Sequence, residues 1–346
     1  MKNNFHHRTG VGRRSLGVTI IELMISLLIG MVIIAAVTYV FFGSRQTSRS
    51  NDMLARIQEN GRIALGAVSD SVRMAGFSGC RSLDSLTQAN NTGGALNFLL
   101  DSNGNPSYIS GHSYTSTDPI AGANGATGSD IITLQYMSTS AARLSKDMTS
   151  PSDDLVFAKT AYTPNFTVGQ YAVIASCSNM DIFKVTAVTA TTSTITVSHA
   201  ALSTSYSTVK GRIGSAVEMT YYVRQTGRTN TQGEPIYGLF RQPTVNGAAV
   251  AGATEDELAE GIDKMVVSYG IDTNNDGNVD QYVATSAMTS TYWPNVASVR
   301  IQFLVSSTDN NILDAAQSYT FNGNTITDRK LHTNVGSTIT LRNRVQ

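Results

Sequence analysis

The sequence predicts an α+β protein, with a long N-terminal α-helix packed on a predominantly antiparallel β head. Two observations predict the helix. Residues 18–42 are predominantly apolar and carry a single charge, Glu22, and an amphipathic pattern continues from there to about residue 75. A third observation predicts the head, because the remaining chain consists of short β-branched or aromatic runs bounded by Gly, Asn, Ser or Pro. The number of such runs leaves room for a second β subdomain.

The composition favours a β-rich protein outside the cytosol over a cytosolic enzyme. Charged residues make up 14% of the 346-residue chain, and its formal net charge is zero. The charge is unevenly placed, because residues 1–17 hold Lys2, Arg8, Arg13 and Arg14 and no acid. The remainder is mildly acidic and shows nothing typical of a nucleic-acid-binding face. We therefore expect no nucleic-acid partner.

Residues 18–42 form the expected membrane anchor. As an α-helix they would reach roughly 37 Å at about 1.5 Å per residue, which is enough to cross a bilayer with some tilt. The basic segment ends at Gly17 and the apolar run begins at once, and this run is too long for the core of a cleaved signal peptide. Because positive charges keep the leader in the cytoplasm, the head is expected on the other side of the membrane.

Glu22 is the one charge in the apolar run. A carboxylate within a membrane helix costs on the order of 2.5–3.5 kcal/mol, so it usually has a function and a partner. Glu22 also lies four residues after Val18, which places both on one helix face about one turn apart. The alternative is an acid without function that reaches the cytoplasmic interface.

The helix is expected to continue past the membrane as one element, from about residue 18 to 75. The chain has no proline before Pro106, and glycines within 76–79 supply the stop signal. Two helices broken at Gly43–Ser44 are the alternative. The expected organisation is a leader at 1–17, a membrane helix at 18–43, its amphipathic continuation at 44–76 and a head at 77–346. The apolar stripe of the continuation comprises Leu54, Ile57, Ala64, Leu65, Val68 and Val72, and the opposite surface carries Arg45, Arg49, Arg56, Arg62 and Arg73.

The head is expected to consist mostly of short strands. Two stretches, 84–130 and 142–165, show little periodicity and are expected to be loops or irregular insertions. One short helix is expected at 255–260, because Thr254 and Glu257 have capping-box spacing. The expected strands are 131–136, 171–176, 182–188, 194–198, 217–224, 236–241, 264–271, 279–284, 297–306 and 338–344.

Two cysteines, Cys80 and Cys177, occur in the chain, outside any CxxC or CxxH arrangement. In an oxidising compartment an even pair most simply forms one disulfide. It would close a loop of roughly a hundred residues and contribute up to about 4–5 kcal/mol in the chain-entropy model. Two separate buried thiols are the alternative.

Residues 272–280, DTNNDGNVD, are the one stretch of the head with metal-ligand spacing. The pattern matches the first nine positions of a calcium loop, with Gly277 at the sharp turn. Position twelve is Val283 where such loops carry a bidentate glutamate. The alternative is a hairpin turn, because Asn-Asp-Gly is a strong turn signal between two strands. The candidate calcium ligands are Asp272, Asn274, Asp276, Asn278 and Asp280.

The sequence gives no reason to expect an enzyme. His6 and His7 lie in the leader, and His112, His199 and His332 stand alone in polar stretches. The chain contains no P-loop, no HExxH and no G-x-S-x-G nucleophile elbow. Aromatic residues of the head are expected to be core or edge residues.

The segment RRSLG followed by VTIIELMISLLIG resembles type IV prepilins. The resemblance implies a cut after Gly17 by a prepilin peptidase, with Val18 as the new and N-methylated terminus. It also implies that Glu22, the fifth mature residue, attracts the N-terminal amine of a neighbouring subunit. This chain has Val18 where the family usually has phenylalanine, and it lacks a mid-span proline. Because the prepilin-like segment is typical of bacterial proteins, the resemblance implies an inner-membrane protein with a periplasmic head.

IQENGRIALGAVSDSVRMAGFSGC, at residues 57–80, is similar to the PilW family of minor pilins. The resemblance implies a pilin-like fold and a structural role, in which the protein primes type IV pilus assembly at or near the tip. The implied partners are other minor pilins, the major pilin and the inner-membrane assembly platform. A J-type pseudopilin of type II secretion and a tip adhesin or DNA-binding module are the alternatives. Further similar pieces lie at 169–177, 267–282, 298–305 and 338–344.

Overall fold

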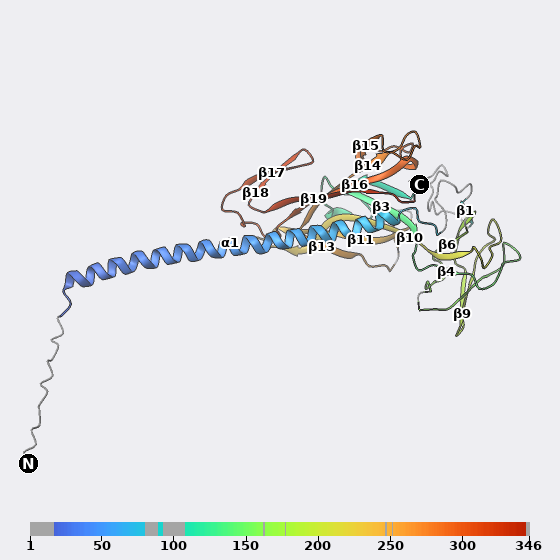
Figure 1. Cartoon of the computed structure of the whole chain (residues 1–346), viewed down its shortest axis with the longest axis horizontal. Coiled ribbons are helices and arrows are strands. Elements are labelled where there is room, and N and C mark those ends of the chain that lie inside the picture. Colours follow the sequence, from blue (N-terminus) through green and yellow to red (C-terminus); the bar gives the residue numbers. More distant parts are fainter. Residues whose placement is uncertain are drawn as a thin grey trace, which may run out of the picture. The chain divides into compact units, whose positions relative to one another are not determined.

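The computed structural model describes residues 17–79, 89–92, 108–161, 163–176, 178–245, 248–250 and 252–343 (Figure 1). The chain forms two compact units, residues 1–52 and 53–346. The helix α1 (Ile20–Met74) begins in the first unit and ends in the second.

The helix α1 is one uninterrupted element, as predicted, and it passes through Gly43 without a break. It begins two residues later than expected and ends one residue earlier. Its end has a local cause: Gly76 adopts a positive φ of 74°, which L-residues other than glycine rarely take. The N–H of Gly76 then donates to the carbonyl of Gln135, 2.9 Å away, so the chain turns into the head.

The largest sheet of the head has ten strands and is organised around its longest strand, β10. The first part of β10 pairs with β4 and β6, and the second part pairs with β3 and β11. Only the β1–β7 pair in this sheet is parallel. The strands are β1 (Ala89–Thr92), β2 (Ile109–Ser113), β3 (Asp130–Met137), β4 (Ala142–Arg143), β6 (Tyr171–Ala175), β7 (Met180–Lys184), β10 (Arg212–Thr229), β11 (Pro235–Val245), β12 (Ala248–Ala249) and β13 (Asp256–Glu260).

A four-stranded antiparallel sheet, in the order β15-β14-β16-β19, forms the second layer of the head. Its strands are β14 (Ile262–Ile271), β15 (Gln281–Ala284), β16 (Val296–Ser306) and β19 (His332–Thr340). A hairpin of β17 (Gln317–Phe321) and β18 (Asn324–Asp328) precedes β19, and three strands, β5 (Leu155–Ala158), β8 (Ala187–Ala190) and β9 (Thr194–Ser198), form a small sheet. Short 3₁₀ helices are η2 (Gly122–Asn124), η3 (Thr285–Ala287) and η4 (Trp293–Asn295).

The main core lies where the second half of α1 meets both large sheets. Buried residues of α1, β3, β10, β14 and β16 belong to one hydrophobic cluster. Two buried polar residues at the start of β3 also join the sheets: the hydroxyl of Ser129 donates to the Met265 carbonyl, and Asp130 accepts from the Val267 N–H at 2.8 Å. Burial raises the pKa of Asp130. A second cluster, around Phe157, Phe183 and Ile213, packs β5, β6, β7 and β9 together.

Most expected strands are confirmed, and the exceptions have long-range causes. Residues 255–260 are the strand β13 and not a helix, because they pair with β11 and their acids bind arginines of β10 and β11. The expected strand 338–344 ends at Thr340 and starts at His332, since β16 offers pairing along that whole length. Residues 182–188 are divided between β7 and β8, and the expected loops contain β2, β4 and β5.

Candidate assembly site

The predicted processing site lies in an exposed segment before α1. Gly17 and Val18 precede the first helical residue, Ile20, and Val18 is 70% exposed. A Cβ added at Gly17 would meet no atom of the chain within 4 Å. A peptidase therefore meets no steric obstacle from the described residues at this bond.

Glu22 lies in the first turn of α1, with an exposed side chain. Its backbone N–H donates to the hydroxyl of Thr19, 3.3 Å away, so Thr19 caps the helix. The Thr-x-x-Glu spacing is that of a capping box, a signal in the sequence that the prediction had missed. Among the described residues, no cation forms an ion pair with the Glu22 carboxylate. The position therefore combines a local capping element with an exposed charge.

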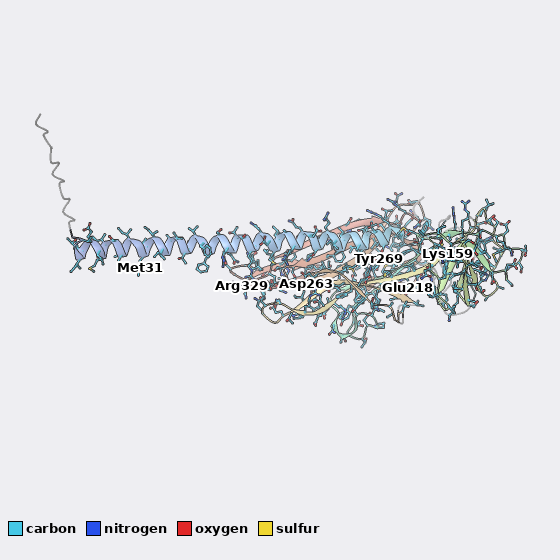
Figure 2. The ribbon with its side chains drawn as sticks, turned by 90° about the horizontal axis from the view of Figure 1, so that it is seen from below. Met31, Lys159, Glu218, Asp263, Tyr269 and Arg329 are labelled. Carbon is cyan, nitrogen blue, oxygen red and sulfur yellow. The ribbon has the colours of Figure 1, made fainter. Side chains whose placement is uncertain are left out.

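The first half of α1 presents apolar side chains that nothing in its own unit covers. It is the one helix of the described residues long and apolar enough to cross a membrane, and none of its most apolar window is buried. Met31, labelled in Figure 2, is 68% exposed. An apolar surface of this size is unfavourable in water and requires lipid or other subunits. By length and composition the segment fits a single-pass membrane anchor.

The second half of α1 fixes the helix to the head. Ile57, Ala64, Val68 and Val72 are buried as predicted, and the five arginines of the opposite face are exposed. Leu54 differs from the prediction, because it is 44% exposed. Polar contacts reach three separate parts of the head: the Asn60 amide donates to the Glu260 carbonyl, the Ser71 hydroxyl is 2.6 Å from the Tyr221 hydroxyl, and the Asn343 amide donates to the Ala75 carbonyl.

Gly61 is buried where α1 passes closest to the four-stranded sheet, and Gly66 is exposed on the same helix. A Cβ at Gly61 would lie 2.8 Å from a methyl carbon of Val335 and 3.4 Å from one of Val305, whereas a Cβ at Gly66 would meet nothing within 4 Å. We expect Gly61→Leu to lower the free energy of unfolding by about 1–3 kcal/mol through overpacking. Gly66→Leu is expected to raise it by about 0.5–1 kcal/mol, because leucine has the higher helix propensity.

Chemical denaturation of the full chain in detergent, compared between the two variants, checks this prediction. Each variant introduces the same side chain into the same helix, so Gly66→Leu is the matched control. Equal effects at both positions would contradict the packing of α1 on β16 and β19.

The loop 272–280 connects the paired strands β14 and β15 as a hairpin turn. A hairpin turn was the alternative to a calcium loop at these residues. Asp272 is 3% exposed and its carboxylate accepts the backbone N–H groups of Asp276 and Gly277, at 3.2 and 2.9 Å. Asp280 accepts from the Thr273 N–H and hydroxyl, and these bonds lower the pKa of Asp280. Among the described residues, no group of three or more His, Cys, Asp and Glu side chains is arranged to hold a metal. Calcium binding at this loop stays a prediction.

Asp272→Ala is expected to destabilise the head by about 2 kcal/mol, because it leaves two loop N–H groups without their buried acceptor. The loss is expected in chelator as well as in calcium, since the bonds are internal to the turn. Thermal unfolding of both proteins in each condition checks this. A calcium-dependent rise in the wild-type midpoint, absent from the variant, would establish the metal site; an Asp272→Ala midpoint equal to wild type would contradict the structural role of the carboxylate.

Both cysteines lie outside the described residues, so their pairing also stays a prediction. Their chain neighbours are described and lie close together. A Cβ added at Gly79, next to Cys80, would lie 3.9 Å from the Cβ of Ala175, two residues before Cys177. The two chain segments that carry the cysteines therefore meet.

Asp263 of β14 lies beside a hollow of about 370 Å³ that Glu234, Asp328 and Lys330 also line (Figure 2). Burial is the largest influence and raises the pKa of Asp263, while Lys330, a hydrogen bond with Ser306 and His332 act in the opposite direction. A raised carboxyl pKa means that the native state keeps a proton which the unfolded chain has already released. The contribution of the protonated Asp263 carboxyl to stability is therefore fully present at pH values below its ordinary pKa of 3.8. It is lost as the pH rises through the raised pKa of the native state.

Asp263→Asn is expected to remove the loss of stability that Asp263 causes as the pH rises. The free energy of unfolding of the variant, minus that of wild type, should grow as the pH is raised from about 4 to about 7. Denaturant titrations at several pH values measure this difference. A difference that is constant or falls with pH would show that attraction to Lys330 outweighs burial.

These features define a class of protein: a single helix that joins an apolar anchor to a two-layer β head. Comparison with protein families identifies the class further. The family model for Type IV Pilus-assembly protein W matches residues 220–343. This segment runs from within β10 to just beyond β19 and includes the whole four-stranded sheet. This similarity supports a PilW-like protein with a role in type IV pilus assembly. No curated protein and no solved structure gave a significant match.

Proposed function

We propose that this protein is a minor pilin that primes the type IV pilus as part of a minor-pilin complex at the fibre tip. The observation that carries the proposal is the combination, in one chain, of the PilW match over residues 220–343 with an exposed Gly17–Val18 bond and the single charge of Glu22 at the start of an exposed apolar helix. A subunit of this design can pack its apolar helix against other such helices once it leaves the membrane. The head then supplies contacts with neighbouring subunits.

We place the protein in the inner membrane, with the leader in the cytoplasm and the head in the periplasm. The basic residues of the leader support this orientation, because positive charge stays on the cytoplasmic side. The proposed partners act in the order of processing, methylation and assembly. A prepilin peptidase cuts after Gly17 and Val18 is methylated, and the assembly platform, other minor pilins and the major pilin then receive the mature subunit.

The proposal assigns the head a structural role and no catalysis. Each histidine of the head has a partner within the fold at one ring nitrogen, while Nε2 of His199 and Nδ1 of His332 are buried without one. His112 lies 2.5 Å from Asp118, whose other carboxylate oxygen accepts two backbone N–H groups of the following turn. The His332 side chain is 4% exposed, lies 2.9 Å from Asp328 and stacks on Tyr319. His199 contacts the carbonyl of Ala200.

Immunogold labelling of pili sheared from cells tests the proposed position. We expect one label at a fibre end, and we expect mass spectrometry of the same fraction to show a mature chain that begins at Val18. Cells that carry a Gly17 variant blocked in processing are the control, and their pili should lack the protein. Label spread along the shaft would contradict the tip position, and absence of the protein from wild-type pili would contradict the role as a pilin.

A further inference from the structure

We propose that β19 is a docking edge that receives an extended strand from a different pilus subunit. In the described part of the chain β19 pairs with β16 alone, so one of its sides is open. The pairing fixes which backbone groups face outward. Leu341 N–H donates to the Ala297 carbonyl, and Ser307 N–H donates to the Leu331 carbonyl. Hydrogen-bonded pairs in this ladder therefore fall on odd residue numbers, and Asn334, Gly336 and Thr338 direct their N–H and C=O groups to the open side.

The open side of β19 lacks the features by which proteins protect sheet edges. The strand is nine residues long, its pairing with β16 has no bulge, and residues 333–340 contain no charge and no proline. Two other edges differ. The β13 edge of the ten-stranded sheet carries Asp256, Glu257 and Glu260. The strand β15, which forms the other edge of the four-stranded sheet that contains β19, has only four residues. The chain therefore protects one edge with acids, keeps another short, and leaves β19 available for pairing.

A groove of about 450 Å³ runs beside this edge and provides space for an added strand. One wall is α1, with Leu65 and Gly66 between the exposed arginines Arg62 and Arg73, and the other wall is formed by Val335 and Ser337 of β19. An added strand would place alternate side chains against α1 and the others beside Asn334 and Thr338. Gly66 leaves space for the first set, because a Cβ there would meet no atom within 4 Å. Arg73, 3.7 Å from Asp70 in an exposed pair, favours an acidic side chain in the strand.

The helix direction argues against a second copy of this chain as the occupant. If two β19 strands paired about a twofold axis, they would be antiparallel, and residues 53–74 of the two α1 helices would also be antiparallel. A fibre of single polarity requires equivalent segments of its subunits to point the same way along its axis, so this antiparallel pair does not fit the proposed function. The occupant we infer is therefore a strand of another pilus subunit, with small or apolar side chains toward α1 and a carboxylate near Arg73. This inference rests on the proposed function.

Asn334→Pro tests the edge directly, in full-length protein expressed in its own cells. Proline at 334 removes an outward N–H and leaves the hydrogen bonds to β16 in place, because position 334 falls on the open side. Asn334→Ala is the matched control, since it keeps the N–H. Gly66→Trp fills the groove from the helix side and provides a second variant that does not alter the sheet. We expect the proline and tryptophan variants to reduce surface pili to the number in a strain without the gene, and the alanine variant to give wild-type numbers.

Photo-crosslinking identifies the occupant. A benzophenone amino acid at Ser337 in the groove should give an adduct with an extended strand of another pilin, and the same probe at Ala284, on the opposite edge of the sheet, should not. An adduct with a second copy of the chain, an adduct with lipid, or equal adducts at both positions would overturn the inference. Normal piliation by folded Asn334→Pro and Gly66→Trp would also overturn it. Failure of the proposed function is distinguishable, because a strain without the gene would then assemble pili normally.

Discussion

Cells whose only copy carries Glu22→Ala should assemble few or no pili, although the protein still inserts into the membrane. The carboxylate is the one charge of the anchor, and it is exposed with no ion-pair partner among the described residues. A charge in that position is unfavourable in lipid unless another subunit pairs with it. Its loss therefore removes an attraction that exists only between subunits. Surface pili per cell, counted by electron microscopy, and membrane levels by immunoblot measure the two expected results.

Two controls separate charge from helix capping. Glu22→Gln removes the charge and keeps a side chain that can accept hydrogen bonds in the capping box. Thr19→Ala removes the observed cap, whose loss costs about 1 kcal/mol at a helix terminus. We expect Glu22→Gln to fail in assembly and Thr19→Ala to retain it. Assembly by Glu22→Gln would contradict the role of the charge, and failure of Thr19→Ala alone would assign the defect to the helix start.

Loss of the predicted Cys80–Cys177 bond should give the largest change in stability. A bond that closes a loop of roughly a hundred residues lowers the conformational entropy of the unfolded chain. In the chain-entropy model this adds about 4–5 kcal/mol to the free energy of unfolding. The position of Gly79 supports the predicted bond, because a Cβ added there would lie 3.9 Å from the Cβ of Ala175. We expect Cys80→Ser, Cys177→Ser and the double variant to lose similar stability in denaturant titrations of the full chain.

Reducing agent provides the matched control. Wild type treated with it should unfold like the double variant, and the double variant should not respond. Intact mass before and after reduction should differ by two hydrogens. A wild-type protein that is insensitive to reduction, with two alkylatable thiols in the native state, would show that the cysteines are separate.

Local patterns were sufficient to predict the helix and most of the strands. The stripe at Ile57, Ala64, Val68 and Val72 repeats at helical spacing, so its buried face could be deduced without the head. Gly61 and Ser69 are buried on the same face and were missed, because neither is apolar enough to register in the pattern. Their burial depends on where the sheets meet the helix, which is tertiary information.

The type of one element and the ends of another depend on long-range pairing and could not be predicted from local patterns. Residues 255–260 satisfy a helix-start rule, but β11 and the arginines of the large sheet make them a strand. The start of β19 at His332 likewise depends on its pairing with β16. The predicted assembly residues Gly17 and Glu22 form a pattern within a few positions, and their role stays a prediction. The groove beside β19, in contrast, joins residues more than two hundred positions apart.

The number of surface pili in a strain that lacks this gene tests the central claim most directly. Retraction should be blocked in the same background, so that the count reports assembly alone. If the protein primes the pilus, the strain should show few or no pili, and re-expression of the wild-type chain should restore them. A normal number of pili without the gene would contradict the account.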